Sequence, residues 1–119
     1  MLLLLSLLSS LVALAEPVRT PHVTAELVAE SATLPAGEPS WIGLRMEHAP
    51  HWHTYWKFPG DSGLPTEVKW TLPAGWKISE ARWPLPSRIP LPPLVNFGFE
   101  GEILIGFEIT PPAGAKGDF

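Results

Sequence analysis

Residues 103–109 read "ILIGFEI" and carry the clearest secondary-structure signal in the chain. Their side chains fall into two alternating sets, with Ile103, Ile105, Phe107 and Ile109 in one and Leu104, Gly106 and Glu108 in the other. Because successive side chains of a β-strand point to opposite faces, this period of two predicts a strand with one buried face.

Two upstream segments show the same alternation. Residues 22–30 read "HVTAELVAE" and residues 41–48 read "WIGLRMEH", with the turn-forming "LPAGEP" between them. We expect the two segments to pair as antiparallel strands. Weaker patterns predict a third strand beginning near His51, a fourth over 68–72 and a fifth over 76–83. The proline-rich residues 84–94 are interpreted as a long connection.

The composition sets the fold class. The chain has 15 prolines and 10 glycines, which interrupt it too often for long helices. Short strands joined by glycine and proline turns predict an all-β protein with an immunoglobulin-like β-sandwich. The patterns mark about six strands, where such a sandwich needs about seven. We therefore expect the sandwich to be incomplete at its C-terminus.

The N-terminal segment has the features of an export signal. Residues 1–15 are apolar with serine interruptions and end in Ala13-Leu14-Ala15, the small-x-small pattern of a secretory cleavage site. The apolar run is shorter than the roughly 20 residues that a membrane-spanning helix needs. We predict a signal peptide over residues 1–15 and one domain over residues 16–119.

Charge and cysteine content exclude several kinds of function. The net charge of −4 is small and acidic, which argues against nucleic acid or an anionic membrane surface as partner. The chain has no cysteine, so a disulfide framework and thiol chemistry are excluded within these residues. No cofactor is expected.

Residues 51–65, "HWHTYWKFPGDSGLP", allow more than one interpretation. The Gly-Asp-Ser-Gly sequence surrounds the nucleophile of some serine proteases, but a protease needs more chain and an oriented histidine. A turn held by the side chains of Asp61 and Ser62 is the favoured interpretation.

The histidines of this stretch are weak candidates for a metal site. On a strand, His51 and His53 would point to the same face, as two imidazole ligands of zinc or copper do, and His48 lies close before them. No histidine follows His53 and the chain has no cysteine, so hydrogen-bonded imidazoles at a sheet edge are favoured and no metal is expected.

The chain has six tryptophans, and an exposed row of them would suit carbohydrate binding. Trp52, Trp56 and Trp70 fall in the apolar register of their predicted strands. Packing in the core is therefore the favoured interpretation of these three.

Three ordered motifs give the chain a resemblance to a known family: residues 51–70, the "WPLP" of residues 83–86, and the "LVNFGFEGE" of residues 94–102. Together they resemble the N-terminal periplasmic domain of DsbD-type thiol:disulfide interchange proteins, including the ScsB-like branch of copper tolerance. The resemblance implies a periplasmic domain of a full-length protein anchored in the inner membrane. It also implies electron transfer from a membrane-embedded redox domain to periplasmic thioredoxin-like proteins, in cytochrome c maturation or copper tolerance.

The resemblance further implies where the chemistry lies. The redox-active cysteine pair of the family falls beyond Phe119, so none of the 119 residues is predicted to be catalytic, and the full-length protein would be the protein-disulfide reductase. By position, residues 96–101 would be a loop that caps the cysteines. The candidates for this cap and for partner binding are Asn96, Phe97, Phe99 and Glu100. Where family members usually carry Gly, Asn, Tyr and Tyr, this chain has His51, Phe58, Phe97 and Phe99.

The sequence thus predicts an electron-transfer domain that is inactive by itself because it lacks cysteine. The alternative is a non-redox periplasmic module that binds copper or a partner protein, and carbohydrate binding is a third hypothesis.

Overall fold

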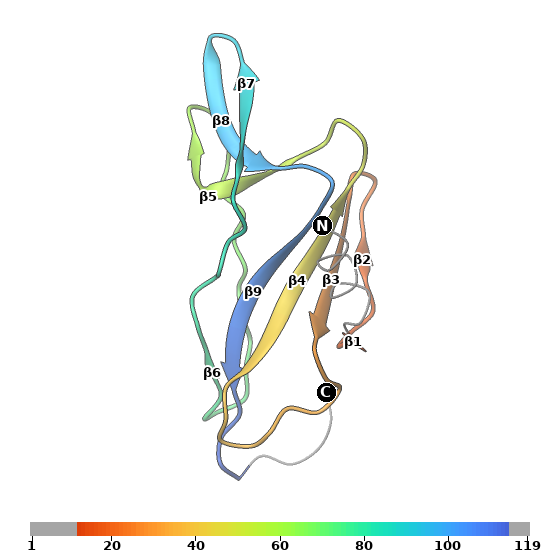
Figure 1. Ribbon diagram of the computed structural model, residues 1–119, viewed down its shortest axis with the longest axis vertical. Helices are drawn as coiled ribbons and strands as arrows, with labels where there is room; N and C mark the ends of the chain where they lie inside the picture. Colours follow the sequence, from red (N-terminus) through yellow and green to blue (C-terminus); the bar gives the residue numbers. More distant parts are fainter. Residues whose placement is uncertain (1–11, 115–119) are drawn as a thin grey trace.

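A computed structural model of the protein describes residues 12–114, and all regular elements among them are β-strands (Figure 1). They form two antiparallel sheets, a large one in the order β1-β3-β4-β9-β6, with β2 also paired to β3, and a small one in the order β5-β8-β7. The prediction of an all-β chain is confirmed. No helix in the described range has the length and hydropathy needed to cross a membrane.

The large sheet contains the strands that the alternating patterns predict. Its members are β1 (Val12–Ala13), β2 (Val18–Arg19), β3 (Val23–Ala29), β4 (Ser40–His48), β6 (Lys77–Ile78) and β9 (Glu102–Thr110). Leu27 lies opposite Leu44, and Leu44 lies opposite Ile105, so the apolar sets of β3, β4 and β9 share one face. The predicted pairing of β3 with β4 is confirmed.

The inner face of the large sheet forms the core. Its buried residues are Ala29, Leu34, Ile42, Met46, Ile105, Phe107 and Ile109. Part of the cover comes from an irregular segment, in which Val68, Trp70 and Leu72 pack on this face. The ring of Trp70 meets that of Phe107 edge to face at 5.0 Å between centroids.

The predicted fourth strand over 68–72 is wrong, although its apolar side chains do face the core. The edge of β9 that such a strand could use is already occupied, because β6 pairs with Thr110 and Ile109 and an isolated bridge joins Arg82 to Gly106. Of the fifth strand predicted over 76–83, only β6 and the bridge at Arg82 are present. Alternation placed the side chains correctly but did not supply a hydrogen-bonding partner.

The small sheet departs most from the sequence prediction. It consists of β5 (Thr54–Gly60), β7 (Ser87–Leu91) and β8 (Leu94–Phe99). Residues 84–94 are therefore not one long connection: β7 and the start of β8 form a hairpin that projects from one end of the molecule (Figure 1). Pro90 fits in β7 because β7 is an edge strand, where a missing amide donor breaks no ladder.

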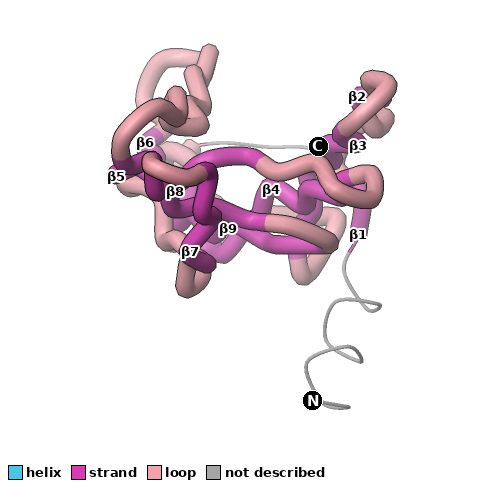
Figure 2. The backbone as a smooth tube through the Cα atoms, turned by 90° about the horizontal axis from the view of Figure 1, so that it is seen from above, coloured by secondary structure: helices cyan, strands magenta, loops and turns pink. Residues whose placement is uncertain are grey.

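Strand β5 is also shifted from its predicted start. Residues 49–52 form a turn closed by the hydrogen bond from Trp52 N to Ala49 O, and His51 has a φ of 69°. The strand begins at Thr54 and continues to Gly60, into residues predicted as loop. Seen from above (Figure 2), β5, β7 and β8 lie toward the β9 side of the large sheet, and β1, β2 and β3 lie on the opposite side.

The predicted signal peptide falls mainly on residues 1–11, which lie outside the described residues. Within its last part, β1 pairs with β3, and Leu14 N donates a hydrogen bond of 2.8 Å to Leu27 O. The side chain of Leu14 packs against the core and lines an apolar cavity of about 430 Å³ with Trp70 and Trp76.

Candidate functional site

The small sheet brings together the two longest motifs of the sequence. Thr54 and Tyr55 of β5 pair with Phe99 and Gly98 of β8, so residues 51–65 lie against residues 94–101. The turn that follows β5 then folds back onto β8. The motifs are far apart in the chain but form one structural unit.

Asn96 is the centre of this unit and is fully buried, with 0% exposure. Its Oδ1 accepts hydrogen bonds from Ser62 N at 2.9 Å and Gly63 N at 3.2 Å, and its Nδ2 donates to Ser62 Oγ at 3.0 Å. A buried carboxamide without partners would be strongly unfavourable, and here both of its ends are paired. Asn96 thus fixes the turn to β8.

Asp61 makes the second attachment of the same turn. Its Oδ2 accepts a hydrogen bond of 2.8 Å from Val95 N, and Asp61 N donates one of 3.0 Å to Val95 O. The interpretation of Gly-Asp-Ser-Gly as a turn is confirmed. The partners of its side chains, however, lie on β8, about 34 residues away, and not in the turn itself.

The predicted cap loop over residues 96–101 is a strand as far as Phe99. β8 is the central strand of its sheet and is bonded to β5 on one side and β7 on the other, which leaves only Glu100 and Gly101 as a turn before β9. Glu100 is exposed, Phe97 is partly buried, and Phe99 is only 3% exposed. The four candidate residues therefore occupy very different surroundings.

Phe99 packs in an aromatic stack under the small sheet. Its ring lies parallel to that of Trp83, at 6.0 Å between centroids and an interplanar angle of 4°. A phenylalanine suits this buried place because it has no hydroxyl that would need a partner. Position 98 must be glycine, since a Cβ there would lie 2.1 Å from the carbonyl oxygen of Thr54.

His48 holds the turn between β8 and β9, a role that the sequence analysis did not predict. Its Nδ1 lies 2.7 Å from Gly101 O, its backbone N donates to the same oxygen at 2.9 Å, and its Nε2 lies 2.9 Å from Thr54 Oγ1. One side chain thus links β4, β5 and the Glu100–Gly101 turn. Both ring nitrogens are engaged.

His51 and His53 do not lie on one face of a strand, which is the arrangement that a metal site would need. Neither His51 nor His53 lies on a strand, because β5 begins at Thr54. His51 is exposed in its turn, and His53 Nε2 lies 3.0 Å from the hydroxyl of Tyr55. Within residues 12–114 no group of three or more His, Cys, Asp or Glu side chains is arranged to hold a metal ion.

A groove of about 440 Å³ lies beside β5. Four residues of β5, 56–59, are opposite the single residue Phe97 of β8, and Trp56 and Lys57 of this bulge line the groove together with the segment 81–86. Phe58 is 63% exposed, and Lys57 Nζ lies 5.1 Å from the centre of its ring. Trp56 Nε1 is buried without a hydrogen-bond partner. This groove is an aromatic and basic surface next to the β5–β8 unit.

The tryptophans follow the core-packing prediction only in part. Trp70 packs on the core, and Trp56 is partly buried at the groove. Trp52 is 47% exposed, and its ring stacks on that of His22 at 3.5 Å between centroids, so the prediction is wrong for Trp52.

Comparison with known proteins gives two findings. The family model described as "Thiol:disulfide interchange protein DsbD, N-terminal" matches residues 23–119. The crystal structure of the N-terminal periplasmic domain of ScsB from Proteus mirabilis matches with a TM-score of 0.61 and 24% identity, over 79% of this chain and 37% of that one. No curated protein sequence matches. The structural likeness confirms the predicted immunoglobulin-like β-sandwich.

Proposed function

The chain belongs to the family of DsbD N-terminal domains, and on this premise we propose that it is a periplasmic electron-transfer domain of a DsbD-like thiol:disulfide reductase. The observation that carries the proposal is the family match over residues 23–119, which includes every strand from β3 to β9. In this role the domain passes electrons from a membrane-embedded redox domain of the same full-length protein to periplasmic thioredoxin-like proteins.

The chemistry requires a group that the 119 residues do not contain. Thiol–disulfide exchange proceeds by attack of a thiolate on a disulfide sulfur, and this sequence has no cysteine. The chain spans 37% of the ScsB domain that it matches. In our proposal the cysteine pair is supplied by chain that follows Phe119, and residues 16–119 are the scaffold on which it is held.

Within this scaffold we assign the partner-facing role to the β8–β9 turn. Glu100 is exposed at this turn and Phe97 is partly exposed on the strand before it. His48 ties Gly101 to β4 and β5, which keeps the turn in a fixed position. Asn96 and Phe99 are buried, so they act by holding β8 in place and not by touching a partner.

The proposed function also includes export to the periplasm with cleavage of the signal peptide. Cleavage after Ala15 would remove residues 1–15 and leave the domain over residues 16–119. It would also take β1 from the edge of β3 and remove Leu14 from the apolar cavity. Mass spectrometry of the exported protein tests this step, because the mature chain is expected to begin at Glu16.

The redox role is tested in two stages. The gene is first read beyond codon 119, where we expect a cysteine pair followed by several apolar spans of about 20 residues. The full-length protein is then mixed with a thioredoxin-like protein whose second active-site cysteine is changed to serine, which should trap a mixed disulfide. Replacing the cysteine pair by serine is the control and should abolish the complex.

Two results would contradict the redox role. One is a stop codon directly after codon 119, and the other is a cysteine pair that forms no mixed disulfide. Either would leave the non-redox binding module as the better hypothesis.

A further inference from the structure

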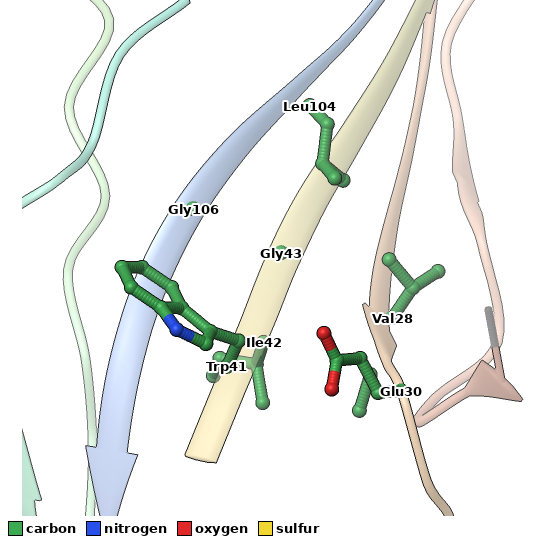
Figure 3. A pocket seen from close by; sticks show the side chains of 8 residues that line it. Val28, Glu30, Trp41, Ile42, Gly43, Leu104 and Gly106 are labelled. Atoms are coloured by element: carbon green, nitrogen blue, oxygen red, sulfur yellow. The ribbon is translucent and has the colours of Figure 1, made fainter. Parts of the chain in front are cut away.

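The outer face of the large sheet has a hollow that two glycines help to line. Gly43 of β4 and Gly106 of β9 lie directly opposite each other, on the face away from the core residues Ile42 and Ile105. Because neither position has a side chain, neighbouring side chains can lie close to the sheet there, and both glycines line a hollow of about 220 Å³ (Figure 3).

Two large side chains lie over these glycines. A Cβ at Gly43 would lie 2.5 Å from Leu104 Cδ1, so the leucine side chain lies over that glycine. A Cβ at Gly106 would lie 3.5 Å from Trp41 Cζ3, so the indole lies over the second glycine (Figure 3). Trp41 is nevertheless 45% exposed. Its indole is therefore supported by the sheet and open to solvent at the same time.

A carboxylate stands at the rim of the hollow. Glu30 follows the end of β3, and Figure 3 shows its carboxylate between β3 and β4, whereas the indole of Trp41 lies on the β9 side of β4. Glu30 is exposed, and the part of the chain that the structure describes offers it no ion pair or side-chain hydrogen bond. Its oxygens are free to accept hydrogen bonds from a ligand.

A second hollow of about 310 Å³ shares Glu30 and Trp41. Its other lining residues are three with hydroxyl side chains, Ser31, Thr33 and Ser40, and three apolar ones, Leu34, Pro35 and Pro39. Hydroxyls donate and accept hydrogen bonds equally well. The indole and the carboxylate thus line both an apolar hollow and a neighbouring one that also offers hydroxyl groups.

We propose that this face binds a neutral saccharide, with one sugar ring stacked on the indole of Trp41 and its hydroxyls bonded to Glu30. A pyranose ring has an apolar C–H face and a rim of hydroxyl donors, which match the indole and the carboxylate respectively. The first hollow, of about 220 Å³, is smaller than the roughly 300 Å³ at which drug-sized pockets begin, so the proposed contact is with one ring.

The charge of Glu30 disfavours two other classes of ligand, the anionic and the purely apolar. An anionic ligand would be repelled by Glu30 and by the net charge of −4. A purely apolar ligand would desolvate the carboxylate without giving it a hydrogen bond, which is unfavourable. A ligand that carries hydroxyls on an apolar ring avoids both penalties. The site lies on the large sheet and does not depend on the redox role.

The test is a calorimetric titration of the whole chain with maltose, cellobiose and N,N′-diacetylchitobiose at millimolar concentrations. We expect saturable binding of at least one of them. Trp41→Ala should weaken that binding by about tenfold or more, and Glu30→Gln should weaken it by a few fold without removing any packed side chain.

Trp52→Ala is the matched control, since Trp52 is as exposed as Trp41 but lies in the loop before β5, against His22. This variant should bind the sugar like the unchanged chain. The proposal is overturned if none of the three sugars binds, if Trp52→Ala weakens binding as much as Trp41→Ala, or if Glu30→Gln has no effect. Binding of a proline-rich peptide at Trp41 in place of a sugar would also overturn it.

Discussion

The two sheets of this protein are held together in different ways. In the large sheet, β3 and β4 are paired at seven successive positions and β4 and β9 at eight, without interruption. In the small sheet, β5 and β8 are paired at only three positions, on either side of a bulge. The large sheet is a regular ladder, whereas the pairing of β5 with β8 in the small sheet depends on a few specific contacts.

The source of stability differs accordingly. The large sheet buries a continuous apolar face, with Ile105 and Phe107 at its centre, and burial of this kind is not directional. The small sheet relies on a backbone contact at Gly98 and on the hydrogen bonds of Asn96, both of which need one particular geometry. The proposed partner-facing turn is attached to the small sheet. Four predictions test this contrast.

Gly98→Ala should have the largest effect. The new Cβ would lie 2.1 Å from a backbone oxygen of Thr54, which cannot move aside as a side chain can, so β5 and β8 must separate. We expect a loss of at least about 4 kcal/mol in the free energy of unfolding, measured by urea denaturation.

Gly106→Ala is the matched control on the large sheet, where the new Cβ would meet Trp41 and Arg82 side chains at 3.5 and 3.6 Å. These are ordinary contact distances, so the loss should stay below about 1 kcal/mol. Equal losses for the two glycines would contradict the contrast between the sheets.

Ile105→Ala should come next, with a loss of about 3 kcal/mol in the same assay. Ile105 is completely buried in the core, and truncation removes apolar contacts and leaves a cavity. Ile103→Ala, at a partly buried position of the same strand, should lose less. A smaller loss at Ile105 than at Ile103 would show that the core is not centred where the structure has it.

Asn96→Ala should cost about 2 kcal/mol, because Ser62 N and Gly63 N lose their acceptor while remaining partly buried. Hydrogen exchange at these two amides should accelerate more than exchange in β4 and β9. Ser62→Ala removes only the hydroxyl and should have a smaller effect. Uniform acceleration throughout the chain would mean that the turn is not a separate unit.

Glu26→Gln should have the smallest effect. Glu26 pairs with Arg45 on the outer face of the large sheet, where both side chains are partly exposed and Arg45 also lies 3.8 Å from Glu102. The expected loss is below about 1 kcal/mol, and it should shrink further in high salt. A loss as large as that of Asn96→Ala would refute the view that apolar burial holds the large sheet.

The sequence predicted the large sheet better than the small one. Alternation predicts strands β3, β4 and β9 because each has one face toward the core and one face toward solvent. The sequence does not reveal the hairpin of β7 and β8, because prolines are typical of segments that interrupt strands, and four of them occur here: Pro86, Pro90, Pro92 and Pro93. Pro90 is accommodated only because β7 lies at a sheet edge. Alternation places Trp52 in the core, but the strand on which that prediction depends begins only at Thr54, two residues after Trp52.

The site residues show the same limit. The motifs identified the family and the segments that matter, yet the predicted cap loop is largely a strand, and its residue Asn96 bonds to a turn 34 positions earlier in the chain. In the sequence His48 is only a neighbour of other histidines, whereas in the structure it links β4, β5 and the Glu100–Gly101 turn. Nothing local in the sequence marks such contacts.

The sequence by itself determined the all-β class, the three strands of the regular ladder, the family, and the lack of any cysteine in these residues. The tertiary structure alone decided which segments form the small sheet, why residue 98 must be glycine, where Asn96 and His48 bond, and which tryptophans remain exposed. The physical reason is that alternation records only whether a side chain faces water. The neighbour that it meets is fixed by contacts between distant segments, which exist only once the chain has folded.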